Sequence, residues 1–217
     1  MDLFSADFLR GLFVSAPGIL FGLTVHEFCH AWVADKFGDH TAASMGRLTL
    51  NPLKHLDPIG TLMLFIAHIG WAKPVPVDPR NLRNPLKDMV FISFAGPASN
   101  LITGVILGLI LRLALPFFLN ASPNGFEEVL LNILYLAVFY NFILALFNLI
   151  PIPPLDGAGI VRGLIPRRWV PGWLRFEQYG MYILLGLVFL DYISHIGIFY
   201  TIILEPVRSL VSIIVGV

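Results

Sequence analysis

Two histidines and a glutamate lie inside an otherwise apolar stretch, residues 20–37 (LFGLTVHEFCHAWVADKF). Ionisable side chains are costly in such a segment, so their presence indicates a function. Residues four apart in an α-helix differ by about 40° around the helix axis, so His26 and His30 point the same way. Two imidazoles on one helix face can bind one metal ion. The stretch therefore predicts a metal centre within a helix.

The same residues form the pattern H-E-x-x-H, in which two histidines bind Zn²⁺ and the glutamate is the general base of a metallopeptidase. The alternative is an accidental pattern on a helix surface, because the motif fixes only three positions. An unpaired charge in hydrocarbon costs several kcal/mol, which disfavours that alternative here. Cys29 falls on the same side, and we interpret it as a small core residue. We predict one zinc ion per chain on His26 and His30, with Glu27 as base.

The composition is that of an integral membrane protein. Of the 217 residues, 57% are hydrophobic and 13% are charged, and the mean hydropathy is +0.80. The apolar runs are continuous rather than alternating, which indicates helices and not barrel strands. The net charge is zero, so no basic footprint for nucleic acid is visible. We expect an all-α polytopic protein in the lipid bilayer, with one protease domain over residues 1–217.

We expect about five transmembrane helices, near residues 8–36, 87–116, 129–150, 179–190 and 195–217. The catalytic core would span residues 8–165, and the C-terminal helices residues 177–217. Residues 58–72 are apolar but number only about 15 where a span needs about 20, so we expect a non-spanning segment. Residues 44–50 (SMGRLTL) alternate Thr and Leu and predict a short β-strand near the active site. An open strand edge there could pair with an extended substrate.

Basic residues predict the orientation. They occur at Arg47, Lys54, Lys73, Arg80, Arg83 and Lys87 in the first region, and at Arg162, Arg167, Arg168 and Arg175 in the second. Residues 117–128 and 191–194 contain no Lys or Arg. By the positive-inside rule, the two basic regions face the cytoplasm. This orientation, with five spans, requires that residues 58–72 do not cross the membrane.

A catalytic zinc usually has three protein ligands and a fourth position for water. In the expected topology the span at residues 129–150 ends at Pro151 on the side where the first helix ends, and Asp156 follows a few residues later. We therefore predict Asp156 as the third ligand. The three prolines that precede it (PIPPLDG) prevent the helix from continuing, and Gly157 allows a tight turn. The alternative is that Asp156 only caps a short helix that begins near Gly157.

Three motifs in this order resemble the site-2 protease family of intramembrane zinc metalloproteases. They are HEFCH at 26–30, GPASN at 96–100 and NLIPIPPLDG at 148–157. The intervening GRLTLNPLKHLDPIGT resembles the minimal bacterial and archaeal branch, and the resemblance covers about residues 15–165. Ala158 stands where the family often has a second glycine, which affects local loop geometry. Neither a PDZ-like insertion nor a CBS pair fits in the length.

The resemblance implies a set of site residues: zinc on His26, His30 and Asp156, Glu27 as general base, and Asn100 and Asn148 near the substrate or its oxyanion. It implies regulated intramembrane proteolysis, with transmembrane proteins as substrates. It also implies a prokaryotic cell (inner) membrane, with the active site toward the cytoplasm.

Other interpretations remain open at this point. The histidine pair could be a transit site in a membrane metal transporter, although transporters spread polar ligands over several helices. An inactive scaffold that binds transmembrane partners is a third class. His55 is either a partner of the site or a solvated loop histidine. We expect His40, His68 and His195 not to be ligands, because no second ligand lies nearby in sequence.

Overall fold

The computed structural model describes residues 6–67, 71–119 and 125–216. The α-helices are α1 (Ala6–Lys36), α2 (Thr41–Ser44), α3 (Pro58–Ala67), α4 (Pro85–Leu119), α5 (Gly125–Asn148), α6 (Asp156–Leu164), α7 (Val170–Ser194) and α8 (Glu205–Val215). Short 3₁₀ turns are η1 (Pro52–Lys54), η2 (Pro79–Asn81) and η3 (Arg167–Trp169), and a π-helical turn, η4 (Tyr200–Leu204), precedes α8. The described residues form no sheet, which confirms the all-α class.

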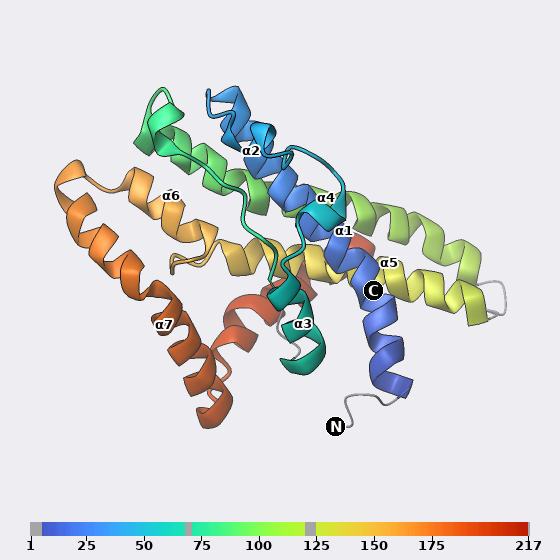
Figure 1. The fold of residues 1–217 in the computed structure, drawn as a ribbon. Coiled ribbons are helices and arrows are strands. Elements are labelled where there is room, and N and C mark those ends of the chain that lie inside the picture. The colour runs from blue at the N-terminus through green and yellow to red at the C-terminus, as the bar shows by residue number, and fades with distance from the viewer. Residues whose placement is uncertain (1–5, 68–70, 120–124, 217) are drawn as a thin grey trace.

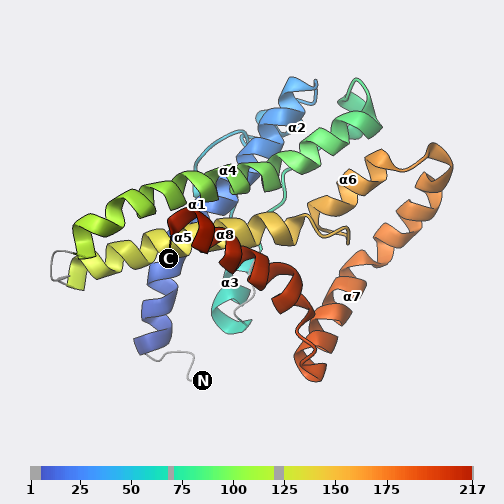
Figure 2. The ribbon, with the colours of Figure 1, turned by 180° about the vertical axis from the view of Figure 1, so that it is seen from behind.

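Three long helices form the centre of the molecule. α1, α4 and α5 all pack against one another, and α6 packs on α4. Figure 1 shows α1 crossing the pair formed by α4 and α5. In the reverse view of Figure 2, α8 lies across α4 and α5 on the other side, while α7 extends away from this group. The first and last helices of the chain thus enclose the α4–α5 pair.

The C-terminal helix is held by a hydrophobic core. Val207 and Val211 of α8 and Ile203 of η4 pack with Leu111 of α4 and Phe142 of α5. All five side chains are nearly inaccessible. Apolar burial contributes roughly 1.5–3 kcal/mol per large side chain in water, although in lipid close packing itself has to supply the gain.

Three helices are long and apolar enough to cross a membrane: Arg10–Lys36 in α1, Pro85–Phe118 in α4 and Gly125–Asn148 in α5. They match the first, second and third of the five spans predicted from the sequence. α7 and α8 do not meet this criterion, so the two further spans stay a prediction. The long apolar helices are those of a membrane protein.

The short apolar segment after the first span contains a short helix, α3, and its non-spanning placement stays a prediction. α3 has 10 residues, which reach about 15 Å along a helix axis, half of the roughly 30 Å of a hydrocarbon core. Residues 68–70, with His68, lie outside the described part of the chain. Ala72 then forms an isolated antiparallel bridge with Leu56, which closes the segment into a loop.

The predicted strand at residues 44–50 is wrong. Ser44 is the last residue of α2, and the chain then turns through Gly46, whose φ of +67° is left-handed. The Arg47 amide donates to Ala42 O at 2.8 Å, so the backbone donors serve to end α2 rather than to form a ladder. The Thr and Leu alternation suited a strand, but the turn chemistry around Gly46 decided the local structure.

Candidate active site

Two distant segments bring three ligand atoms together. His26 and His30 lie one turn apart on α1, and their Nε2 atoms are 2.9 Å from each other. Asp156, the first residue of α6, places Oδ2 at 3.0 Å from His26 Nε2 and 3.3 Å from His30 Nε2. Both histidines are buried. The structure thus assembles the predicted trio, although His30 and Asp156 are 126 positions apart in sequence.

The chain between α5 and α6 explains how Asp156 arrives. α5 ends at Asn148, and residues 149–155 contain three prolines, which cannot continue a helix. A side chain at Gly157 would collide with the carbonyl oxygens of Leu149 and Ile150. Glycine is therefore needed for α6 to start this close to the end of α5. Leu155 occupies the N-cap position, so the alternative role of Asp156 as a helix cap is not the one observed.

Hydrogen bonds fix the tautomer of His30. Its Nδ1 lies 2.6 Å from the carbonyl oxygen of Ile92. A carbonyl only accepts, so Nδ1 carries the hydrogen and donates it. In the neutral ring Nε2 is then an acceptor and faces the other two ligand atoms. A backbone carbonyl of α4 thus orients one candidate ligand of α1.

His26 is oriented by two buried asparagines. Its Nδ1 lies 2.6 Å from Asn100 Oδ1. The Asn100 amide donates to Gly22 O and to Asn141 Oδ1, both at 3.0 Å, and Asn141 donates in turn to Ala137 O at 2.7 Å. The two carbonyl oxygens can only accept, so they fix which way each amide faces. Asn100 therefore presents its oxygen to His26, whose Nδ1 donates and whose Nε2 becomes an acceptor.

The trio fits a zinc ion. With both Nδ1 atoms donating, two imidazole lone pairs and a carboxylate oxygen converge on one point, and they repel one another unless a cation lies between them. Asp156 Oδ2 is buried and accepts no hydrogen bond from the described residues, as expected of an atom that a cation would bind. Ligand atoms around a tetrahedral Zn²⁺ at about 2.0 Å lie about 3.3 Å apart, close to the distances observed.

α4 leaves room for the imidazoles at one residue. A side-chain carbon at Gly96 would collide with Nε2 of both His26 and His30. Glycine at this position lets the backbone of α4 approach the two rings closely. The GPASN motif thus contributes twice to the site, through the missing side chain of Gly96 and through the amide of Asn100.

Glu27 lies at the edge of the same group. Only 8% of its surface is exposed, and its Oε2 accepts a hydrogen bond from the Val75 amide at 3.0 Å. A cavity of about 240 Å³ also opens beside Asp156, lined by polar groups of Ser93, Arg162 and Glu177. A carboxylate next to the ligand group and a cavity that can hold water are what a hydrolytic site requires.

Asn100 differs from its predicted role. Both of its amide hydrogens are already donated, to Gly22 and Asn141, and the side chain is fully buried. The donors that an oxyanion would need are therefore taken, and we assign Asn100 to the orientation of His26. Asn148 donates to Leu144 O within its own helix, and its contact with substrate stays a prediction.

The remaining predicted residues lie outside the trio. His55 is buried, which excludes a solvated loop histidine, and its Nε2 donates to Thr49 O at 2.8 Å. Cys29 is a free, half-buried thiol. His40 pairs with Asp35 at 2.6 Å, and His195 ends α7 in a left-handed conformation. Among the described residues, one group of His, Cys, Asp or Glu side chains has the geometry to bind a metal, and it is the trio above.

Asn141 was not identified from the sequence as a residue of the site. The signal that could have found it is its place in the apolar run YLAVFYNFILALF of α5, because a polar side chain within a membrane helix needs a partner. Leaving its amide unpaired in a buried site would cost about 1–3 kcal/mol.

Asn141 and Asn100, which we call the asparagine relay, can be tested for their role in orienting His26 by truncating Asn141. In Asn141→Ala, Asn100 loses the acceptor that helps to hold its amide, so His26 becomes less well oriented. We expect zinc affinity to fall about 10–100-fold, the usual effect of losing a partner that orients a ligand. Competition with a chelator measures the affinity. Asn148→Ala is the matched control on the same helix and should bind zinc as the wild type does; equal affinities of all three proteins would contradict the relay.

Comparisons with known proteins agree with this geometry. The model of Peptidase family M50 matches residues 121–190. The chain is 41% identical over 169 residues to YwhC of Bacillus subtilis (strain 168), covering 78% of this chain and 77% of that protein. It is 36% identical over 167 residues to Rip2 of Mycolicibacterium smegmatis and 35% identical over 156 residues to Rip2 of Mycobacterium tuberculosis. These matches cover 71% and 68% of this chain and 61% and 56% of the two Rip2 proteins.

All three relatives carry the description "putative zinc metalloprotease" in their names. No solved structure matches the chain significantly. The similarity to YwhC extends over most of both proteins, and the His-His-Asp group is compatible with zinc. The chain is therefore a zinc metalloprotease that belongs to peptidase family M50, the site-2 protease family.

Proposed function

We propose that this protease hydrolyses peptide bonds within or at the edge of transmembrane segments of membrane proteins, in regulated intramembrane proteolysis. The observation that carries the proposal is the place of the metal trio. Two of its members belong to α1, in the stretch Arg10–Lys36 that is long and apolar enough to cross a membrane. The third belongs to α6, which packs on the membrane helix α4.

The depth of the site supports a substrate in the bilayer. His30 and His26 precede Lys36, the last residue of α1, by six and ten residues. At a rise of 1.5 Å per residue they lie about 9 and 15 Å from that end of the helix. A hydrocarbon core is about 30 Å thick, so the site would lie within one leaflet. Peptide bonds at that depth belong to membrane-embedded segments.

The residues of the site divide the chemistry among them. His26, His30 and Asp156 would hold the zinc ion, which supplies a Lewis acid that polarises the scissile carbonyl and acidifies water. Glu27, adjacent to His26, takes the proton of the attacking water and passes it to the leaving amine. Asn100 and the carbonyl of Ile92 keep the imidazoles in the tautomer that leaves Nε2 free. Asn148 is the remaining candidate to contact the substrate.

The distribution of basic residues supports a location in a prokaryotic cell membrane with the site toward the cytoplasm. Five Lys and Arg residues lie between the first two membrane helices, Lys87 lies in the first turn of α4, and four lie between α5 and the middle of α7. Positive charge accumulates on the cytoplasmic side. Five spans, with α7 and the C-terminal region added to the three long helices, would satisfy this rule. Water would then enter through the cavity beside Asp156.

A metal transporter, the alternative from the sequence, gains no support from the described residues. A transporter distributes polar groups along a path through the bilayer. Here the candidate ligands converge on one point, and the other polar side chains of the region serve to orient them. Glu27 has a task in hydrolysis and none in transport.

The general-base role is tested by separating metal binding from turnover. In Glu27→Gln, the amide cannot accept a proton, and we expect kcat to fall by about 10²–10⁴-fold with zinc content unchanged. In Asp156→Ala the trio loses its anion, and zinc content and activity should fall together. Elemental analysis and cleavage of a model transmembrane substrate measure both. A fully active Glu27→Gln would exclude Glu27 as the base.

The substrate class is tested with paired substrates in proteoliposomes. A helix hides its backbone carbonyls in hydrogen bonds, so a substrate must unwind before cleavage. We expect a transmembrane substrate with a central Asn-Pro or Gly-Gly pair to be cleaved about tenfold or more faster than its Leu-Leu version, because such residues weaken the helix. Equal rates for both, or faster cleavage of an unfolded soluble protein, would count against the proposal.

A further inference from the structure

A short extended segment passes over the active site and is fixed at both ends. It consists of residues 73–78 (KPVPVD), between α3 and α4, and we call it the proline strap. Figure 1 shows the chain running from α3 toward η2 and the start of α4 as an extended trace. Pro74 and Pro76 have fixed φ angles and no amide hydrogen. Val75, between them, directs its amide to the Glu27 side chain.

The contact with Glu27 is specific. The Val75 amide donates to Oε2 of Glu27 at 3.0 Å. The other carboxylate oxygen, Oε1, accepts no hydrogen bond from the described residues. A carboxylate held through one oxygen keeps the second free in a defined direction, which is the requirement for a base that must reach a water molecule on the neighbouring metal.

The start of the strap is anchored by residues that precede α3. The Lys73 amide donates to His55 O at 2.8 Å, and the Lys73 carbonyl accepts from Arg47 Nη2 at 2.5 Å. His55 and Arg47 are both buried. His55 thus acts on the strap through its backbone, and its imidazole ties this anchor to Thr49.

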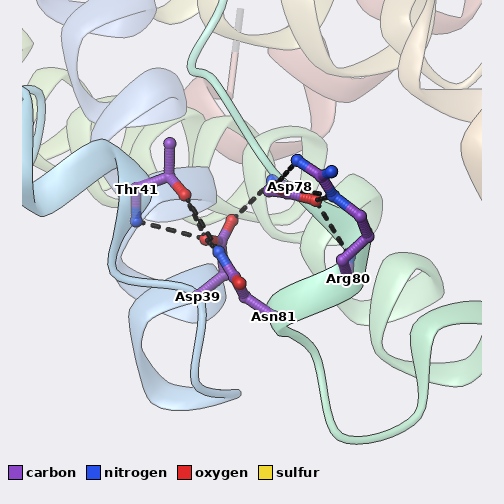
Figure 3. Close-up of polar contacts among 5 residues, drawn as sticks. All are labelled: Asp39, Thr41, Asp78, Arg80 and Asn81. Carbon is purple, nitrogen blue, oxygen red and sulfur yellow. Dashed lines mark hydrogen bonds and ion pairs between the residues drawn. The ribbon is translucent and has the colours of Figure 1, made fainter.

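The end of the strap is anchored by Asp39, directly after α1. Asp39 is fully buried, and its Oδ2 accepts the Asp78 amide at 2.7 Å. Its Oδ1 accepts from the Asn81 side chain at 2.9 Å, and from the Thr41 hydroxyl at 2.5 Å and amide at 3.1 Å. Figure 3 shows these donors surrounding the carboxylate, with Arg80 paired to Asp78 beside them.

The surroundings keep Asp39 ionised. Burial alone would raise the pKa of its carboxyl. The hydrogen bonds from Asn81, Thr41 and Asp78 together lower the pKa by more than burial raises it, so it lies below the usual range. A carboxylate offers only acceptor oxygens, which matches a shell of donors alone. Bonds to an ionised acceptor are also stronger than bonds between neutral groups.

We propose that Asp39 is a positioning residue of the protease: by binding the Asp78 amide it holds the proline strap in the register that places the Val75 amide on Glu27. The inference rests on the proposed role of Glu27 as general base. Three residues of extended chain between Val75 and Asp78 span at most about 10 Å, and two prolines stiffen the strap, so fixing its ends fixes its middle. The Val77 side chain supports the same register by packing against the buried cluster of Ala34, Leu82 and Ile92.

The geometry also couples the strap to the helix that carries the metal ligands. α1 ends at Lys36, and Gly38, with a φ of +104°, turns the chain so that Asp39 points back toward η2. Asp39 and Glu27 are thus joined twice, once through the last two and a half turns or so of α1 and the turn after it, and once through the strap. A shift of the strap by one residue would bring Pro74 or Pro76 to Glu27, and neither has an amide hydrogen.

The first experiment measures the strap itself. In Asp39→Asn the amide group has one acceptor oxygen in place of two and brings hydrogens toward existing donors. We expect hydrogen exchange of a peptide that contains residues 73–78 to accelerate by about tenfold or more. Asp35→Asn is the matched control, because Asp35 lies at the same end of α1 and pairs with His40 rather than with the strap. Unchanged exchange in Asp39→Asn would overturn the proposal.

The second experiment measures the consequence for turnover. In Asp39→Asn we expect kcat to fall about 10–100-fold, the effect of a small misplacement of a catalytic group, with KM within about threefold and zinc content unchanged. Val75→Pro removes only the amide donor from an already extended, proline-flanked position and should reproduce this loss. Val75→Ala keeps the amide and should remain within about threefold of the wild type.

The outcomes separate the two proposals. Wild-type kcat in Asp39→Asn, or equal kcat in Val75→Pro and Val75→Ala, would overturn the positioning role. If Asp39→Asn does not fold, the comparison of the two Val75 variants decides. A wild-type protein that cleaves no transmembrane substrate would refute the proposed function, while the exchange measurement still tests the anchor.

Discussion

The central constraint of this structure is the electrostatic repulsion among three acceptor atoms that the fold holds close together. Two imidazole nitrogens and a carboxylate oxygen lie 2.9 to 3.3 Å apart in a buried place. In a medium of low dielectric constant such lone pairs repel strongly unless a cation is present. The surrounding helices hold them there by hydrogen bonds to the outer nitrogens of both rings. The fold is therefore arranged for an ion that the three atoms share.

Much of this arrangement follows from the sequence. Helical periodicity predicts that His26 and His30 lie on one face. The cost of ionisable groups in an apolar segment indicates that this pair has a function. Asp156 follows from topology, because a span that returns to the side where α1 ends must deliver its next carboxylate there. The apolar runs predict the three long helices, with boundaries a few residues from those observed.

Other features depend on tertiary contacts that no local pattern reveals. Residues 44–50 alternate as a strand would, but the turn at Gly46 ends α2 and uses the backbone donors. GPASN was recognised as a motif without the reason for its residues: Gly96 gives space to two rings, and Asn100 faces His26 because Gly22 and Asn141 hold its amide. The role of Asp39 could not be predicted either, since two of its donors, Asp78 and Asn81, lie about 40 positions later in the chain.

These contacts share one physical origin. Polar groups inside a membrane protein cannot be satisfied by water, so each must find a partner in the protein, and a connected set of partners is rigid. The asparagine relay and the proline strap are two such sets, and both end at residues of the HEFCH motif. The ligands and the candidate base are thus held in place from opposite sides by α4, α5 and the loop before α4.

Zinc-edge X-ray absorption of the purified protein tests the central claim most directly, because it reports the atoms bound to the metal without any substitution. The account predicts a shell of two imidazole nitrogens and light oxygen ligands at about 2.0–2.1 Å, without sulfur. A sulfur ligand at about 2.3 Å, which would indicate Cys29, or a shell with one imidazole would contradict the shared site of His26, His30 and Asp156.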